Sequence, residues 1–127
     1  MVAKVADSVI DDGLASLKSL AAKLFICTTE PTTYAEASST YAKGVKDAGA
    51  GAIFPGAIAA GSNGRKVTTL SITDGTVSGD GTVAYWGITT ITGGAALLAN
   101  GGLSAGQAVT TGNTFSLAAF DITIKSQ

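Results

Sequence analysis

The sequence contains no histidine, a single cysteine and few charged residues, and each shortage excludes a class of function. Without histidine the chain has no Ser-His-Asp or Cys-His catalytic arrangement and no histidine general base. One cysteine cannot form an internal disulfide framework or a cysteine-based zinc site. Because nine acidic residues offset eight basic ones, the chain also lacks the basic stripe of a free-standing nucleic-acid-binding domain.

Long hydrophobic runs are missing as well. The apolar region 48–60 is interrupted by Pro55 and several glycines, and it is too short to span a bilayer. The first residues, MVAKVADS, contain no secretory apolar stretch. We therefore expect a soluble protein that is made in the cytoplasm and does not enter a membrane.

Hydrophobic residues, 46% of the 127, suffice for the core of one domain, which we expect to cover 1–127. The charges are unevenly distributed, since the only charged residues in 67–124 are Asp74, Asp80 and Asp121. A solitary protein normally keeps its exterior charged. This half is therefore either solvated by its many hydroxyl groups or covered by other subunits, and we favour the second interpretation.

The first part of the chain is expected to be helical. Residues 1–24 carry apolar side chains at helical spacing, and Ser8 with Asp11 fits a capping box at the helix start. The next apolar run, 23–28, is typical of a short strand.

A second helix is predicted from Thr33. Thr33 and Glu36 have the spacing of a capping box, and Gly44 stands where a helix C-terminal glycine is common.

A glycine-rich segment, Gly44–Gly64, carries apolar side chains without a helix or strand period. Long aperiodic segments within a compact domain are commonly functional. We therefore predict an arm that is mobile in the isolated protein and docks on a neighbouring subunit. The alternative is that Phe54 completes the domain's own core. The candidate interface consists of Ile53, Phe54, Ile58 and the basic pair Arg65 and Lys66, which would form an ion pair across the interface or cap the next strand.

From residue 65 onward apolar and polar side chains alternate, which is typical of strands. Glycine-containing pairs predict turns at 74–75, 80–81, 93–94, 100–102 and 112–113. The stretch 82–92 is the longest predicted strand, and it is apolar on both faces near Trp86, so it should be central in its sheet. In 115–124 the apolar residues change parity, which predicts a bulge around Ala118 and Ala119.

These patterns predict a mainly β (α+β) fold. It would be an antiparallel β-sandwich or small barrel of about six short strands, with one or two N-terminal helices. Residues 1–64 would supply the helices, a short strand and the arm, and 65–127 the β-body. The candidate core consists of Leu70, Ile72, Trp86, Phe115 and Leu117.

No group of residues fits a catalytic, metal-binding or cofactor-binding site. Cys27 lies in an apolar strand with no cation to lower its pKa, and we interpret it as a buried small hydrophobic residue. Asp74 and Asp80 are interpreted as ordinary turn residues, because their segment lacks the ligand pattern of a calcium loop. Residues 61–66 lack the Gly-Lys-Ser/Thr ending of a phosphate-binding loop. We therefore expect no enzyme and no cofactor.

Three stretches of the sequence carry a resemblance to a known family. They are ICTTEPTTYAEA at 26–37, GRKV at 64–67 and LSAGQAVTTGNTFSL at 103–117. Through them the chain is similar to small structural proteins of tailed bacteriophages, over nearly its whole length from Val5 to Ile124. The resemblance implies a virion component, specifically a capsid decoration (cement) protein. It carries no site motif, so no functional residue is implied.

The partners implied are the major capsid protein and copies of the chain itself, as a dimer or trimer, with no nucleic acid and no membrane. The implied location is the capsid exterior of the virion, after synthesis in the bacterial host cytoplasm. Two alternatives stay open. A tail, neck or fibre-associated virion protein would share this composition but occur in few copies. A carbohydrate-binding β-module would need exposed aromatic side chains on one face, for which Tyr85 and Trp86 are the candidates.

Overall fold

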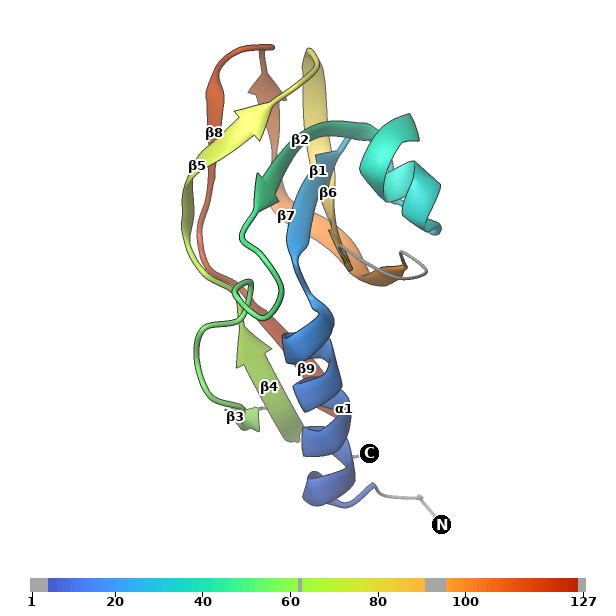
Figure 1. Ribbon diagram of the computed structural model, residues 1–127, viewed down its shortest axis with the longest axis vertical. Helices are drawn as coiled ribbons and strands as arrows, with labels where there is room; N and C mark the ends of the chain where they lie inside the picture. The colour runs from blue at the N-terminus through green and yellow to red at the C-terminus, as the bar shows by residue number, and fades with distance from the viewer. Residues whose placement is uncertain (1–4, 62, 91–95, 126–127) are drawn as a thin grey trace.

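The computed structural model describes residues 5–61, 63–90 and 96–125, and it confirms a mainly β fold (Figure 1). Six strands form an antiparallel sheet in the order β7-β6-β1-β2-β5-β8, and three form a smaller sheet in the order β3-β4-β9. The elements are α1 (Asp7–Leu20), β1 (Lys23–Cys27), the π-helical turn η1 (Glu36–Thr40), β2 (Ala42–Asp47), β3 (Ala59–Gly61), β4 (Gly64–Thr68), β5 (Ile72–Val77), β6 (Gly81–Thr89), β7 (Leu97–Val109), β8 (Thr114–Leu117) and β9 (Asp121–Lys125).

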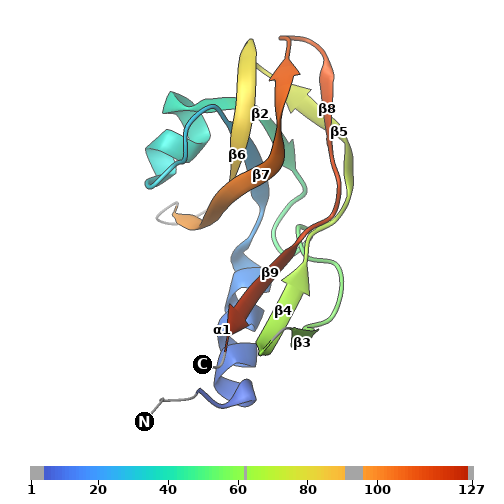
Figure 2. The same ribbon diagram turned by 180° about the vertical axis from the view of Figure 1, so that it is seen from behind.

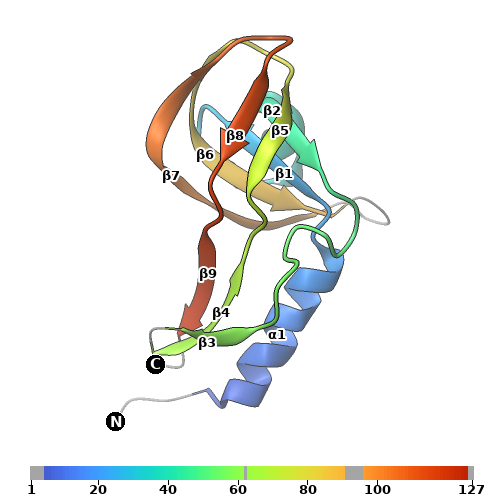
Figure 3. The same cartoon turned by 90° about the vertical axis from the view of Figure 1, so that its left-hand side faces the viewer.

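The six-stranded sheet curls toward a barrel. Its two edge strands, β7 and β8, meet at the turn 110–113 and diverge below it (Figure 3). At this turn Gly112 has a positive φ of 89°, as expected for the predicted glycine turn. Among the described residues no strand ladder joins β7 to β8, so the curled sheet keeps an open seam.

The small sheet and α1 form the other end of the molecule, where both chain termini lie (Figure 2). Helix α1 contacts β4, and its inner side buries Ile10 and Leu14. Asp11 accepts a 2.7 Å hydrogen bond from Arg65 Nε on β4, which fixes the helix on the sheet. A helix is therefore present as predicted, but it spans Asp7–Leu20 where 1–24 was expected, and the capping box at Ser8 is wrong. Helix α1 begins after Ala6 without a side-chain cap.

The predicted second helix is only a short turn. Thr33 caps this turn as predicted, because its Oγ1 accepts a hydrogen bond from the N–H of Glu36 at 3.1 Å. The helix does not continue, however, and the chain enters β2 at Ala42. Gly44 therefore lies inside a strand and ends no helix. A Cβ atom at Gly44 would lie 2.8 Å from the carbonyl oxygen of Thr76, so glycine allows β2 and β5 to approach closely.

The glycine-rich segment is not an arm. Ile53 and Phe54 are 0% and 1% exposed and belong to the chain's own core. The backbone around them is anchored too, because the N–H of Leu70 donates to the carbonyl of Ile53 at 2.8 Å and the N–H of Gly51 donates to that of Ala21 at 3.0 Å. The alternative interpretation of Phe54 therefore holds, and the prediction that Ile53 and Phe54 dock on another subunit is wrong.

Two of the predicted turns are strand interiors. Asp74 and Gly75 lie inside β5, and the segment 100–102 lies inside β7. The pair at 80–81 does not close a hairpin either, because β5 and β6 are not neighbours in the sheet. The predicted turn at 93–94 falls outside the described residues.

The predicted division at residue 64 does not separate two structural parts. Strands β1 and β2, from the first half of the chain, lie in the middle of the large sheet between β6 and β5. Strand β6 has the interior position predicted for 82–92, but β7 is the longest strand, with 13 residues.

The parity change near Ala118 and Ala119 marks a change of sheet. Strand β8 ends at Leu117 on the large sheet, and β9 begins at Asp121 on the small one. The irregularity was predicted at the correct place, but it is a break between two strands and no bulge within one.

The candidate core residues lie together on the inner side of the curled sheet. Ile72, Trp86 and Phe115 are buried in one hydrophobic cluster, against which Leu70 and Leu117 pack while half-buried.

Candidate functional site

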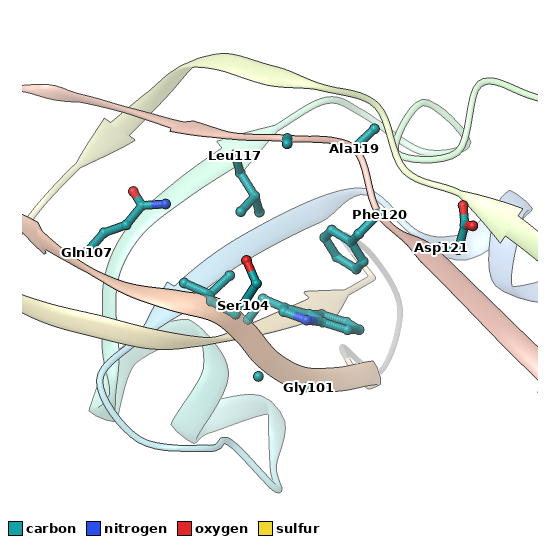
Figure 4. A pocket seen from close by; sticks show the side chains of 11 residues that line it. Gly101, Ser104, Gln107, Leu117, Ala119, Phe120 and Asp121 are labelled. Atoms are coloured by element: carbon teal, nitrogen blue, oxygen red, sulfur yellow. The ribbon is translucent and has the colours of Figure 1, made fainter.

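The open seam of the large sheet contains a cleft with a volume of about 520 Å³ (Figure 4). One wall is β7, and the other is the end of β8 with the junction that leads into β9. The lining residues are Trp86, Gly101, Gly102, Leu103, Ser104, Gln107, Leu117, Ala118, Ala119, Phe120 and Asp121.

The β7 wall is irregular at the cleft. Between the register pairs Val83–Gln107 and Tyr85–Gly102, one residue of β6 faces four residues of β7. This bulge contains Leu103 and Ser104, and Figure 4 shows the Ser104 hydroxyl on the side of the cleft that faces Leu117. Gln107 Nε2 donates to the carbonyl oxygen of Ser116 across the seam at 3.4 Å. A side chain thus connects the two edges where a closed barrel would have a backbone ladder.

The floor of the cleft is aromatic. The rings of Trp86 and Phe120 lie with centroids 4.7 Å apart and a tilt of 42°. On β7, the cross-strand partner of Trp86 is Gly101, and a Cβ atom there would lie 2.8 Å from the indole. Trp86 therefore packs between the Gly101 backbone and the Phe120 ring, with only 8% of the residue exposed.

Asp121, the single charged residue among the described residues that line the cleft, is engaged with its own chain. Its carboxylate accepts a 2.5 Å hydrogen bond from Thr68 Oγ1 and a 3.1 Å bond from Lys66 Nζ. These bonds lower the pKa of Asp121 below its ordinary value, and the bond from Thr68 has the larger effect. The rest of the cleft is uncharged.

The basic pair proposed for an interface is bound within the chain. Arg65 pairs with Asp11 at 2.7 Å, which raises the pKa of its guanidinium, and Lys66 pairs with Asp121. The predicted ion pair across an interface is therefore wrong for both residues. Ile58 is half-buried and packs against the core.

The carboxylates singled out by sequence are separated. Asp74 binds Lys46 at 2.9 Å, and Asp80 accepts hydrogen bonds from the backbone and hydroxyl of Thr111. Within the described ranges no three His, Cys, Asp or Glu side chains are grouped so that they could hold a metal ion. No described helix is both long and apolar enough to cross a membrane.

The interpretation of Cys27 as a buried hydrophobic residue is confirmed. The side chain is fully buried, its thiol faces the carbonyl oxygen of Ala37 at 3.6 Å, and burial raises the pKa of the thiol to about 11. A thiol with this pKa stays protonated near neutral pH and is a poor nucleophile.

Sequence reasoning placed Trp86 and Leu117 in the core but did not identify the cleft beside them. Ser104 and Gln107 lie on β7 and Phe120 follows β8, the next strand in the chain, but the cleft exists because these two strands are the unpaired edges of the curled sheet. The parity change at Ala118 and Ala119 was the one sequence signal at this place.

Comparisons with known proteins give no relative. No family model matches the chain, no curated protein is similar to it in sequence, and no solved structure matches it in fold.

Proposed function

We propose that this chain is a structural protein of a tailed-bacteriophage virion, which decorates and cements the capsid through contacts with coat subunits and with copies of itself. The family resemblance of the segments 26–37, 64–67 and 103–117 suggests the virion. The uncharged and unpaired edges of the large sheet support a role in assembly.

The edge strand β7 carries the proposal. It has 13 residues, none of them charged and none proline, and the sequence contains no charged residue from 81 to 120. Proteins that act alone usually protect an edge strand with lysine, proline or an inward-pointing charge, since free backbone groups invite another strand to pair. The bulge at 103–106 protects part of β7 only. An edge of this kind is suited to being covered by a partner.

Nearby acidic residues do not supply the missing charge. Asp74, Asp80 and Asp121 all have partners within the chain, and Asp74 and Asp121 are neutralised by Lys46 and Lys66. Charge depletion of this extent is typical of the central part of a protein–protein interface.

The carbohydrate-binding alternative requires an exposed aromatic face. Trp86 does not offer one, because Gly101 and Phe120 cover its ring. Tyr85, its neighbour on β6, points to the opposite face of the sheet because adjacent strand residues alternate. We therefore prefer the assembly function.

Stoichiometry tests the proposal. Virions of the phage that encodes this chain would be purified, and band intensities compared with those of the coat protein on a denaturing gel. We expect hundreds of copies per particle, and particles from a deletion mutant should bind the added recombinant chain to saturation. A copy number near that of a single tail or neck ring would contradict decoration and favour a tail or neck protein. Complete absence from virions would refute both.

A further inference from the structure

We propose that the cleft between β7 and the β8–β9 junction binds an extended, uncharged polypeptide segment, which lies in the open seam as an additional strand. The inference deepens the proposed function and rests on it only for the source of the segment, which is a coat subunit of the capsid. Binding itself is a property of the isolated chain.

The geometry of the seam favours an additional strand. The six strands curl until the edges β7 and β8 face each other, yet they are not joined by a ladder. Adjacent strands in a sheet lie about 4.8 Å apart and bond backbone to backbone. Here the connection is made by the long side chain of Gln107 to the backbone of Ser116. The edges are therefore too far apart to pair directly, and both present backbone groups to the gap.

The chemistry of the lining also fits an extended peptide. Leu117 and Phe120 point into the cleft from one wall, and Ser104 from the other (Figure 4). Apolar side chains on both walls, with Leu103 on β7, and the hydroxyl and backbone groups of β7 match an extended peptide, which presents alternate side chains to pockets and its backbone to a strand edge.

The charges around the cleft favour a neutral segment. Asp121 is already neutralised by Lys66, and no other lining residue is charged. A charged side chain that entered the cleft would lose its hydration without finding a partner. The segment bound here is therefore neutral where it faces Leu117 and Phe120.

The size agrees with a short strand. A volume of about 520 Å³ lies within the range of ligand pockets, about 300–1,000 Å³. A strand extends by about 3.3 Å per residue, so a few residues fill such a cleft. A sugar ring is less well matched, because the Trp86 ring has no free face on which to stack.

Trp86 provides the assay, since it is the only tryptophan and it lines the cleft. The purified chain would be titrated with the peptide acetyl-TVTVTVTV-amide while tryptophan emission is recorded. Control titrations would use acetyl-TVTKTKTV-amide and a neutral cello-oligosaccharide. The variant Ser104→Lys places a charge in the cleft, and Ser71→Lys places the same charge at an exposed position outside it. Circular dichroism would establish that both variants fold.

We expect saturable binding of the neutral peptide and at least about tenfold weaker binding of the lysine-containing peptide. Ser104→Lys should weaken binding by at least the same factor, and Ser71→Lys should leave it unchanged. No saturable change, equal binding to both variants, or binding of the oligosaccharide in place of the peptide would overturn the inference. Self-association that the peptide competes away would overturn it too, because a second copy would then occupy the cleft. A parent chain that binds no peptide but attaches normally to particles would refute only this inference and leave the proposed function standing.

Discussion

At the scale of single residues, two glycines that look like turn residues in the sequence are covered by aromatic rings. Gly75 on β5 faces Phe115 on β8, and Gly101 on β7 faces Trp86 on β6. A Cβ atom on Gly75 would lie 2.2 Å from the Phe115 ring. An aromatic side chain that lies over a cross-strand glycine fills the space that the missing side chain leaves, and so compensates for its weak strand preference.

This arrangement predicts opposite effects for two glycine-to-alanine substitutions. Gly75→Ala should destabilise the fold by about 1–3 kcal/mol, because the Phe115 ring is 3% exposed and has little room to move. Gly13→Ala should stabilise it by about 0.5–1 kcal/mol, since Gly13 lies inside α1 with no atom near its virtual Cβ. Urea unfolding measures both changes. Equal effects would show that the Phe115 ring does not determine the choice of glycine.

Trp86 is the second residue whose role can be measured directly. Its indole is buried between Gly101 and Phe120, so Trp86→Ala would leave a large cavity at the floor of the cleft. We expect a loss of about 3–5 kcal/mol, which is enough to unfold a marginally stable domain. Thermal unfolding followed by circular dichroism would test this. A variant with unchanged stability that had only lost ligand binding would instead favour an exposed recognition role for Trp86.

At the scale of elements, local patterns predicted what local forces determine. Helix α1 and β1 follow from apolar spacing, and the change of sheet after β8 from a change of parity. Gly44, Gly75 and Gly101 were interpreted as residues of turns or helix ends, but all three lie inside strands. The local sequence cannot distinguish these cases, because a glycine is also used in a strand where a group from a neighbouring strand leaves no room for a side chain. The glycine-rich segment was misinterpreted for a related reason, since its burial depends on packing of Phe54 against parts of the chain remote in sequence.

The anchoring of this segment gives a prediction at the element scale. Phe54→Ala should destabilise the whole fold by about 3–5 kcal/mol, because the side chain is 1% exposed and fills the core. Pro55→Ala is the matched control, since Pro55 is exposed, and its cost should stay below about 1 kcal/mol, the usual effect of the freedom that the unfolded chain gains. Chemical denaturation of both variants decides the matter. An intact, equally stable Phe54→Ala protein would restore the arm hypothesis.

The contact between β4 and β9 makes stability depend on pH. Thr68 and Lys66 on β4 bond the Asp121 carboxylate on β9 and lower its pKa in the folded protein below the ordinary 3.8. A lowered folded pKa gives stability that is present above the unfolded pKa and is lost as pH falls through the folded value.

Asp121→Asn should therefore be less stable than the parent chain near neutral pH, and the difference should shrink as the pH falls below the ordinary carboxyl pKa of 3.8. Urea unfolding at several pH values measures it. Asp12→Asn is the control, because Asp12 is exposed and the described residues offer it no hydrogen bond or ion pair, so its effect should be small at every pH. A difference for Asp121→Asn that stays constant with pH would show that the carboxylate charge is not what stabilises this contact.

At the scale of the whole molecule, the candidate cleft could not be predicted from the sequence. Its walls, around Ser104 and around Phe120, belong to consecutive strands joined by the turn 110–113, and they enclose a cleft because these strands are the unpaired edges of the curled sheet. The sequence shows that 81–120 carries no charge. It does not show that two strands of this stretch, β7 and β8, are the unpaired edges of the sheet, because that depends on the strand order.

The other unpartnered surface is apolar and lies mainly at the end of the molecule that carries both termini. The exposed large hydrophobic side chains among the described residues are Val5, Val9, Leu20 and Ile124. Val9 and Leu20 are separated by eleven residues, or three helical turns, so they lie on the same side of α1. Ile124 pairs in register with Arg65, which is bonded to Asp11 on α1, and this places Ile124 close to the start of the helix. A second copy of the chain could cover this surface.

Self-association through α1 is the last prediction. Val9 is 60% exposed, and a closed dimer or trimer would remove it and its neighbours from water. Light scattering coupled to size-exclusion chromatography should therefore show a dimer or trimer for the parent chain. Val9→Glu should shift it toward the monomer, because a carboxylate in an apolar contact loses hydration without a partner. Ala15→Glu adds the same charge at an exposed position six residues along the helix, on another side, and should leave the oligomer intact. A monomeric parent chain, or equal dissociation by both variants, would show that copies of the chain do not meet at this surface.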